Sequence, residues 1–479
     1  MNENKWLNKL KNFFKNKSIL VLGLGVEGKS AINFLGRNYE DILYSKLFIL
    51  DKIKTNEEVE KIVEDESNKK IEEINGKNIP SEFYDDILET EYNEEYNLNN
   101  YDIILKSPGI KLNELVSKKY KEKIYSQIEI FLKFFPGITI GITGTKGKST
   151  TSSLIHFILK KCGYDSYLMG NIGNAVFYNL SKINKKSIAV IELSSFALEN
   201  IVTPTNIAII TNIFIAHLDH HKDLDEYISS KIKIFKNIDN FQKEKNNHKV
   251  KYYKKYIIEK TENYIKSGYE NNVICIKDIK VNIGKTNLLG EHNILNAKVA
   301  KKALLDLGEN LKLEKLSEKN IDKAIEEFKG LKHRLELVYK DDNISYINDS
   351  IATVPESTIN ALKSVSDVET LILGGDDNML PTEKVIKYIN EISEDKKNTL
   401  KNLILLPDSG KRIEKEFSKK YNIFLVENVR EAANLAKKIH KNGSVLLSPA
   451  ARSYGYYKSF EDRGDQFKDE IKKMYNFKD

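Results

Sequence analysis

Short apolar runs without regular polar alternation recur along the chain, and most of them end at glycine or at a polar residue. Runs of this kind predict strands that are buried on both faces, as in parallel sheets. Helical patterns lie between the runs, and this alternation is typical of α/β domains. The predicted strands cover residues 18–23, 47–50, 101–106, 138–143, 187–191, 207–211, 345–347, 370–373, 402–406, 423–426 and 444–447.

Breaks in the alternation divide the chain into three predicted domains, residues 1–136, 137–331 and 332–479. We expect the first and third domains to be Rossmann-like, and the central domain to resemble a P-loop ATPase. Two stretches rich in lysine and asparagine, residues 54–100 and 236–272, interrupt the pattern. We interpret the first stretch as surface helices or a mobile insertion, and the second as an excursion from the α/β alternation.

One loop in the second domain predicts nucleotide binding. The segment ITIGITGTKGKSTTSSLI, which begins at Ile138, predicts a strand, a glycine-rich loop and a helix start. Backbone N–H groups of such a loop cradle phosphate oxygens, a lysine contacts the β- and γ-phosphates, and a hydroxyl ligates Mg²⁺. The loop is tighter than the usual form, because Gly144 replaces the glycine expected five residues before Gly147. The residues expected to contact the phosphates of a nucleoside triphosphate, which the family resemblance described below identifies as ATP, are Gly144, Thr145, Lys146, Gly147, Lys148, Ser149 and Thr150.

A second glycine turn opens the first domain. Gly23, Gly25 and Gly28 follow the first predicted strand, and Asp51 ends the second strand. This arrangement is typical of dinucleotide-binding domains, in which the acidic residue contacts a ribose. It would fit an NAD-dependent dehydrogenase, but that alternative leaves the GTKGKST loop unexplained.

Composition narrows the class of protein. The 479 residues include 76 basic and 69 acidic ones, interspersed along the chain, so we expect no nucleic-acid partner. Cys162 and Cys275 lack metal-ligand spacing, which indicates a reducing compartment and argues against a zinc site or a disulfide scaffold. No apolar run reaches the length of a membrane span. We therefore expect a cytoplasmic protein. As a separate expectation, we take it to act as a monomer.

Further polar groups follow the predicted strands of the second and third domains. Taken singly, each has an ordinary structural explanation, such as a helix cap, a salt-bridged arginine or a solvated histidine. Carboxylates placed after strands suit Mg²⁺, which prefers oxygen ligands. The groups are Glu192 in ELSSF, His217 in HLDHH, Lys231, Asn293, Asn296, Arg334 and Asp349.

The order and spacing of these groups resemble the Mur ligase superfamily over essentially the whole chain. ELSSF, the SPGI that begins at Ser107, and the tail LSPA…SFEDRG resemble its glutamate-adding branch. The resemblance implies an ATP-dependent acid–amino-acid ligase of peptidoglycan precursor synthesis. Such an enzyme would join glutamate, with D-glutamate favoured, to UDP-N-acetylmuramoyl-L-alanine through an acyl phosphate.

The resemblance also implies roles for individual residues. The first domain would bind the UDP group, with residues 25–27 at the pyrophosphate and Asp51 at the uracil. The implied substrate-binding residues are Gly25, Val26, Glu27, Asp51, Ser107, Asn171, Ser194, Thr353, Arg452, Ser453, Tyr454 and Phe460. ATP would also contact Asn293, Asn296, Arg334 and Asp349, and the implied catalytic residues are Lys148, Glu192, His217 and Lys231.

Two Mg²⁺ ions belong to this implied site. Ser149 and Glu192 match the ligands of one ion, and His217 and Lys231 match those of the other. The family's lysine is carbamylated at this position. An unmodified ammonium would repel Mg²⁺, so the role of Lys231 requires the modification.

The chain departs from the family where the glutamate carboxylate is held. Ile351 and Asn378 occupy positions at which the family commonly has lysine. Arg452, beside Ser453, is a candidate to restore the positive charge. These departures leave two alternatives open: a ligase that adds L-glutamate, and a nucleotide-sensing homologue without catalytic activity.

Overall fold

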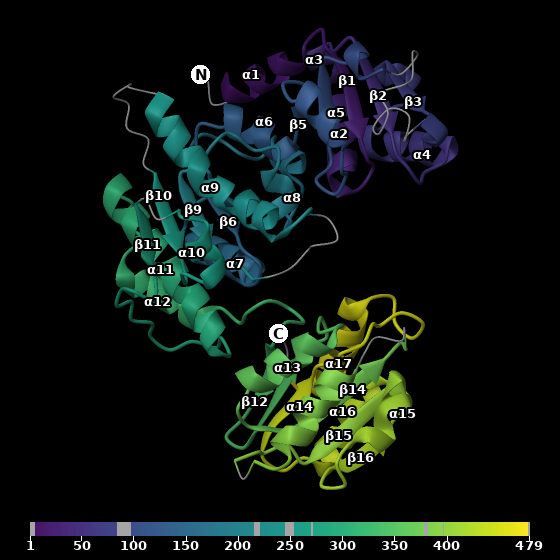
Figure 1. Cartoon of the computed structure of the whole chain (residues 1–479), viewed down its shortest axis with the longest axis vertical. Coiled ribbons are helices and arrows are strands. Elements are labelled where there is room, and N and C mark those ends of the chain that lie inside the picture. The colour runs from purple at the N-terminus through teal and green to yellow at the C-terminus, as the bar shows by residue number, and fades with distance from the viewer. Residues whose placement is uncertain are drawn as a thin grey trace. The chain divides into compact units, whose positions relative to one another are not determined.

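Three separate sheets organise the described part of this computed structural model (Figure 1). In Figure 1 the first sheet is purple to blue, the second is teal to green, and the third is green to yellow. The α/β fold class predicted from the sequence is confirmed. The described residues are 5–83, 97–214, 221–244, 253–269, 272–377, 382–395 and 397–477.

The first sheet has five parallel strands in the order β3-β2-β1-β4-β5. Its middle strand has the sequence SILVL, and four of these five residues are buried. The strands are β1 Ser18–Leu22, β2 Lys46–Leu50, β3 Gly76–Ile79, β4 Ile103–Lys106 and β5 Ile124–Tyr125. The helices are α1 Lys5–Phe14, α2 Val26–Arg37, α3 Tyr39–Ile42, α4 Asn56–Ser67, α5 Glu114–Lys119 and α6 Gln127–Phe134.

Part of the interpretation of residues 54–100 is wrong. Residues 76–79 form β3, which pairs with β2 and is therefore part of the sheet. The sequence of this edge strand is GKNI, and only Ile79 is buried, so no apolar run marked it. Residues 84–96 of the same stretch lie outside the described residues.

The second sheet has six parallel strands in the order β11-β10-β9-β6-β8-β7. Its strands are β6 Ile138–Thr143, β7 Ser166–Gly170, β8 Ile188–Glu192, β9 Ile207–Ile210, β10 Lys254–Ile257 and β11 Val273–Cys275. The associated helices are α7 Lys148–Lys161, α8 Ser195–Leu198, α9 Leu224–Glu244, α10 Glu262–Lys266, α11 Glu291–Leu311 and α12 Glu318–Glu327, with the short 3₁₀ helix η5 Val176–Asn179.

The interpretation of residues 236–272 as an excursion is also wrong where β10 joins the sheet. The strand escaped notice because its sequence, KKYI, begins with two lysines. Lys255 is nevertheless buried, and its ammonium lies 2.7 Å from the carboxylate of Asp239 on α9. An ion pair therefore replaces the apolar contact that a buried strand normally shows.

The third sheet has six strands in the order β12-β13-β17-β14-β15-β16. It was predicted to be parallel, but its edge strand β12 runs antiparallel to β13. The strands are β12 Glu336–Lys340, β13 Ile344–Asn348, β14 Val368–Gly375, β15 Asn402–Asp408, β16 Asn422–Leu425 and β17 Gly443–Leu447. The helices are α13 Pro355–Ser364, α14 Glu383–Ile392, α15 Ser409–Ile413, α16 Val429–Ile439 and α17 Phe460–Tyr475.

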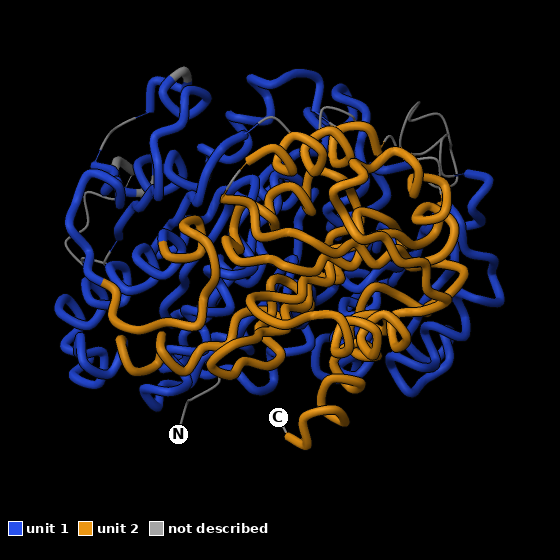
Figure 2. Tube along the Cα trace, turned by 90° about the horizontal axis from the view of Figure 1, so that it is seen from below, with its two compact units in different colours: residues 1–282, 295–321 blue, residues 283–294, 322–479 orange. Residues whose placement is uncertain are grey.

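The chain forms two compact units (Figure 2). The first comprises Met1–Asn282 and Leu295–Ile321, and the second comprises Ile283–Ile294 and Asp322–Asp479. The first two sheets share the first unit and one hydrophobic core, in which Phe177 of η5 packs 5.2 Å from the ring of Phe34 on α2. The three domain boundaries drawn from the sequence stay a prediction.

In the described residues, no helix is both long and apolar enough to cross a membrane.

Candidate active site

The carboxyl ends of three neighbouring strands of the second sheet meet at one edge. In the order β9-β6-β8, Ile142 on β6 is paired with Glu192 on β8, and Thr143 is paired with Ile210 on β9. The glycine-rich loop follows β6 directly. Parallel pairing thus places the loop, Glu192 and the residues after β9 side by side, at the sheet edge where α/β proteins bind ligands.

The loop conformation depends on glycine at position 144. Gly144 has a φ of +142°, and a β-carbon there would lie only 1.9 Å from Thr211 Oγ1. Asn212 then holds the loop, because its carbonyl accepts the Thr145 N–H (2.9 Å) and its Oδ1 accepts the Lys146 N–H (2.9 Å). The loop is therefore fixed by the segment that follows β9.

Two lysine side chains converge on this loop. Lys148 Nζ donates to the carbonyls of Gly144 and Thr145, at 3.0 Å each, and Lys231 Nζ donates to the same Gly144 carbonyl at 3.0 Å. Lys231 projects from α9, is 2% exposed, and lies 4.6 Å from the ring centroid of Tyr227. Burial, and then the positive charge of Lys148, lowers the pKa of Lys231 to about 7. A substantial fraction of Lys231 is therefore a neutral amine near neutral pH.

Glu192 and Ser149 are the predicted Mg²⁺ ligands at this edge. Glu192 is 1% exposed, and its Oε1 accepts a hydrogen bond of 2.8 Å from Asn171 Nδ2. Ser149 is half-buried in the first turn of α7, and Thr150 beside it is buried. In the described residues, no three His, Cys, Asp or Glu side chains gather as a metal site. One carboxylate and one hydroxyl suit Mg²⁺, which completes its shell with water and phosphate oxygens.

The two predicted adenine-side asparagines lie in different units. In the first unit, Asn296 is buried, and a β-carbon at Gly147 would lie 2.7 Å from its Oδ1, so this amide borders the phosphate loop. In the second unit, Asn293 is buried and its Nδ2 donates to the carbonyl of Leu289 at 2.8 Å. Contact of either residue with adenine stays a prediction.

The first sheet carries the other glycine turn. Gly25 and Val26 are exposed where α2 begins, whereas Glu27 is half-buried. Asp51 fixes this turn: Oδ2 accepts the Leu24 N–H (2.7 Å), and Oδ1 accepts the N–H of Ile53 (3.0 Å). Asp51 thus has a structural role, and its predicted uracil contact remains a prediction.

Two further predicted substrate residues also have local hydrogen bonds. Ser107 Oγ donates to the Gly23 carbonyl at 3.3 Å, which links the end of β4 to the glycine turn. Ser194 caps α8, because its Oγ accepts the Ala197 N–H at 3.0 Å. Substrate contacts of both residues stay predictions.

In the second unit, Asp349 follows β13 and is buried. Its Oδ1 accepts the Leu335 N–H (3.1 Å), and its Oδ2 accepts the Ser448 hydroxyl (2.9 Å). Burial raises the pKa of Asp349 to about 7, against the effect of these hydrogen bonds and of Arg334. Arg334 itself is exposed. The carboxyl organises the local backbone, and its contact with ATP stays a prediction.

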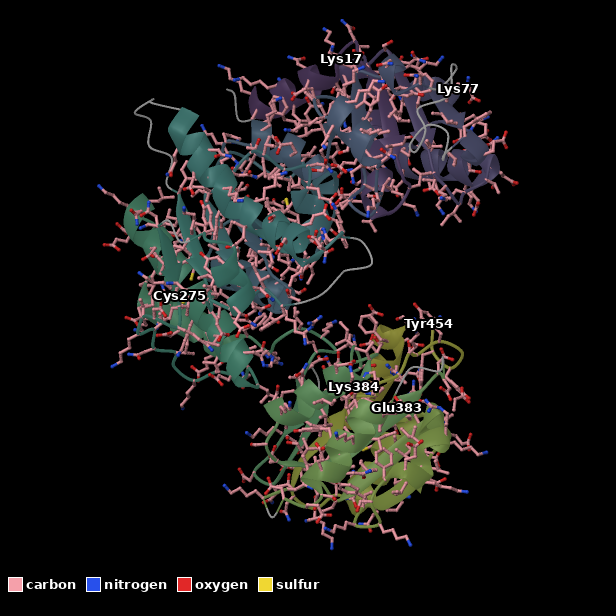
Figure 3. All side chains as sticks on the ribbon, in the orientation of Figure 1. Lys17, Lys77, Cys275, Glu383, Lys384 and Tyr454 are labelled. Atoms are coloured by element: carbon pink, nitrogen blue, oxygen red, sulfur yellow. The ribbon has the colours of Figure 1, made fainter. Side chains whose placement is uncertain are left out.

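The predicted glutamate residues surround the carboxyl ends of β13, β14 and β17. Ser453 is buried and Thr353 is half-buried, whereas Arg452 is exposed. Phe460 opens α17, and Tyr454, labelled in Figure 3, is 62% exposed. These locations leave the glutamate contacts untested. His217 and Asn378 lie outside the described residues.

Sequence reasoning did not assign roles to several residues that shape these sites. Arg463 is completely buried, and it donates to Ser350 Oγ (3.0 Å) and to the carbonyls of Ser350 (2.9 Å) and Ala451 (3.1 Å). It thereby ties the loop after β13 to the loop after β17. Tyr227 OH lies 2.8 Å from Thr145 Oγ1 in the phosphate loop. The SFEDRG motif contains Arg463, so the sequence could have indicated this residue. No sequence motif marks Tyr227.

Comparisons with known proteins agree with this geometry. Residues 142–304 match the family model of the Mur ligase middle domain. A UDP-N-acetylmuramoylalanine–D-glutamate ligase of Clostridium tetani is 32% identical, over 98% of this chain and 100% of that protein. The enzyme of the same name from Clostridium kluyveri is also 32% identical, over 97% of this chain and 98% of its own.

Solved structures share the fold. A UDP-N-acetylmuramate–alanine ligase from Thermotoga maritima has a TM-score of 0.52 and 17% identity, and the match covers 96% of this chain and 100% of that one. The chain therefore belongs to the Mur ligase family and, within it, groups with the UDP-N-acetylmuramoylalanine–D-glutamate ligases. The resemblance and the predicted enzyme class, an ATP-dependent ligase, are confirmed.

Proposed function

We propose that the protein joins D-glutamate to UDP-N-acetylmuramoyl-L-alanine by an ATP-dependent ligation, a cytoplasmic step of peptidoglycan precursor synthesis. One observation carries the proposal. The phosphate loop, Glu192 and Lys231 converge at one sheet edge, in a chain that matches D-glutamate ligases almost from end to end. The relatives' name favours D-glutamate over L-glutamate, and it favours an active ligase over a sensing homologue or a dehydrogenase.

The reaction forms an amide through an acyl phosphate. A carboxylate oxygen of the substrate attacks the γ-phosphorus of ATP, and ADP leaves. The amine of glutamate then attacks the acyl carbon, phosphate leaves, and the nitrogen loses a proton. Lys148 already lies over the loop, where its ammonium needs only to exchange two carbonyls for phosphate oxygens. Its charge would stabilise the negative charge that develops during phosphoryl transfer.

Glu192 and Ser149 fit one Mg²⁺ site. Bound Mg²⁺ supplies neutralisation of the crowded phosphates. Asn171 holds one oxygen of Glu192 at 2.8 Å, and Ser152 Oγ lies 3.5 Å from the other. These contacts would orient the carboxylate toward the loop, as the hydrogen-bonding partners of metal ligands generally do.

Lys231 is suited to carbamylation. A neutral amine attacks carbon dioxide, forms a nitrogen–carbon bond and releases a proton, which converts the neutral amine into a carbamate anion. The lowered pKa of Lys231 provides the neutral amine, and the nearby ammonium of Lys148 would stabilise the resulting carbamate. With His217, the carbamate would provide ligands for a second Mg²⁺. This role explains why a lysine is buried beside another lysine.

The second unit would hold glutamate at the carboxyl ends of β13, β14 and β17. Arg463 fixes the backbone of residues 350 and 451, close to Thr353 and Ser453 in the sequence. Ile351 does not supply the family's cation there, and Arg452 is the proposed replacement. A guanidinium can bind a carboxylate through two hydrogen bonds.

The deciding experiment measures phosphate release with ATP, Mg²⁺ and UDP-N-acetylmuramoyl-L-alanine, with D- or L-glutamate as the second substrate. We expect release with D-glutamate, and formation of the corresponding amide detected by mass spectrometry. Preference for L-glutamate would overturn the stereochemical part. No release with either amino acid, from a protein that binds ATP, would overturn the ligase proposal.

Calorimetry tests the first domain separately. UDP-N-acetylmuramoyl-L-alanine should bind and NAD⁺ should not. Saturable NAD⁺ binding that Asp51→Ala weakens would contradict the proposal and favour a dinucleotide site.

A further inference from the structure

The glycine turn of the first sheet contains an acidic side chain that faces inward. Val26, the first residue of α2, is 67% exposed, but the next residue, Glu27, turns its carboxyl toward the sheet. Glu27 Oε2 is buried and accepts no hydrogen bond from any residue that the structure describes. The carboxyl borders a cavity of about 10 Å³, which has room for a single water molecule.

The groups around this cavity do not form an ion pair with Glu27. From β4, Lys106 is the charged neighbour, but its ammonium donates to the carbonyls of Ile110 (2.6 Å) and Ser107 (3.3 Å). From α6, the amide of Gln127 donates to the backbone carbonyl of Glu27, and its Oε1 accepts the Ser30 hydroxyl at 2.7 Å. The remaining lining residues, Val21, Gly28, Ala31 and Leu105, carry no charge.

This environment favours the neutral carboxylic acid. Burial raises the pKa of Glu27 to about 7, and the charge of Lys106 offsets only part of this effect. Burial also lowers the pKa of Lys106, against the attraction of Glu199 and Glu27. Lys106 therefore does not enforce a negative charge on Glu27, and the carboxyl titrates near physiological pH.

The backbone at the same turn is arranged for an anion. In the described part of the chain, the N–H groups of Gly25, Val26 and Glu27 donate to no acceptor, as expected at the start of a helix. Such N–H groups, together with the helix dipole, attract phosphate. A carboxylate anion next to them would repel a diphosphate, whereas a neutral carboxyl would not.

We propose that Glu27 must carry its proton when this turn binds the diphosphate of the substrate, and that ionisation of its carboxyl weakens binding. The inference rests on the proposed function, which places a UDP group at this turn. It adds the requirement that the Glu27 carboxyl be protonated for binding, which the N–H groups of a helix N-terminus alone would not impose. Substrate binding should therefore release no proton at low pH and should take up one proton above neutrality.

The test is calorimetry of UDP-N-acetylmuramoyl-L-alanine between about pH 5.5 and about pH 8.5, a range on both sides of the Glu27 transition. A diphosphate diester keeps its charge over this range, so it adds no transition of its own. Wild-type affinity should fall about tenfold or more as pH rises, because a carboxylate anion on the second residue of α2 would repel a diphosphate bound at the start of this helix. Glu27→Gln should bind with the affinity of the low-pH wild type at every pH.

Glu60→Gln is the matched control, because Glu60 is exposed on α4 of the same sheet. It should follow the wild-type profile, and ATP affinity should vary with pH identically in all three proteins. A Glu27→Gln protein that keeps the wild-type pH dependence would overturn the inference alone. Failure of all three proteins to bind the substrate, with ATP binding intact, would overturn the proposed function as well.

Denaturant unfolding without ligand tests the protonation state itself. The folded pKa of Glu27 lies above the value of 4.5 for an exposed glutamate, so ionisation destabilises the folded state. The penalty is absent below pH 4.5, grows as pH rises toward 7, and is then constant. Across that window, the unfolding constant of wild type should rise about 300-fold relative to that of Glu27→Gln. A ratio independent of pH would overturn the inference.

Discussion

The two glycine turns of the first unit have the same backbone topology, but the side chains around them differ in charge. Each turn follows a buried strand of a parallel sheet and leads into a helix, α2 in one case and α7 in the other. Each is held by a side chain that follows a neighbouring strand: Asp51 accepts the Leu24 N–H at 2.7 Å, and Asn212 accepts the Lys146 N–H at 2.9 Å. Equivalent topology therefore produces equivalent anchoring.

The side chains around the two turns are opposite in character. At the second turn, Lys148 and Lys231 both donate to the Gly144 carbonyl. At the first turn, the buried group is Glu27, and the ammonium of Lys106 is bound to carbonyl groups. The comparison shows that the backbone of either turn provides N–H donors for a phosphate group. The charges of the surrounding side chains then determine how much negative charge the bound phosphates can carry. Under the proposed function, the second turn would bind a triphosphate with Mg²⁺, and the first would bind a diphosphate through its N–H groups.

Removing the cation of the second turn should have the largest effect. Lys148→Ala should lower the rate of phosphate release by about 10²–10³-fold or more, because a charged donor is lost from the phosphoryl-transfer site. Circular dichroism should show an intact fold. Lys185→Ala, which removes an exposed lysine on the loop before β8, is the control and should keep full activity. If folded Lys148→Ala protein released phosphate at the wild-type rate, the proposed difference in charge between the two turns would have no role in catalysis.

The second lysine of this turn should be nearly as sensitive. Lys231→Ala should lose most of its activity, about 10²-fold, and formate should restore part of it by replacing the lost anion. With ¹³C-labelled bicarbonate, the wild-type protein should show a carbamate signal that this variant lacks. Lys236→Ala, an exposed position on the same helix, should retain both the signal and the activity.

The pH dependence of Lys231 has a definite sign. Its folded pKa, about 7, lies below the ordinary value of 10.5, so the penalty for burying the charged amine is complete below pH 7 and disappears by pH 10.5. Without carbon dioxide, Lys231→Met should therefore stabilise the protein most at or below neutral pH. A fully active Lys231→Ala protein would contradict the assignment.

The third sheet extends the comparison to the proposed glutamate site, where Ile351 and Asn378 stand at positions at which the family commonly has lysine. If Arg452 replaces it, Arg452→Ala should raise the KM for glutamate about ten- to a hundredfold, equivalent to about 1.5–3 kcal/mol for a charged hydrogen bond. The KM for ATP should hardly change. Arg430→Ala in the same unit is the control, and its KM for glutamate should equal that of wild type. An unaltered KM in Arg452→Ala would assign the carboxylate to Thr353, Ser453 and backbone N–H groups.

Substitution of the residues that anchor the two turns should have the smallest effects, and these effects should be on stability. Asp51→Ala and Asn212→Ala should each lower the free energy of unfolding by about 1–3 kcal/mol, because the first leaves three backbone N–H groups without their acceptor and the second leaves one. Asp51→Asn retains an acceptor oxygen and should recover part of the loss. A loss confined to one of the two alanine variants would show that the turns are not anchored equivalently.

Regular apolar runs made most strands predictable, and irregular strands were missed for identifiable reasons. β1 and β6 are apolar and buried, so their patterns marked them directly. β10 was hidden because Asp239 neutralises Lys255 inside the sheet, and β3 was hidden because an edge strand needs little apolar surface. Local patterns record burial of apolar side chains, but they do not record burial that an ion pair or an edge position permits.

The sequence by itself determined the α/β class, the phosphate loop and the family, because these depend on local spacing along the chain. Only the tertiary structure decided that Lys148 and Lys231 share one carbonyl, that Asn296 borders Gly147, and that Arg463 joins two distant loops. It also decided the inward turn of Glu27. Burial, and with it the pKa of a buried group, is set by residues far apart in sequence that fold into contact.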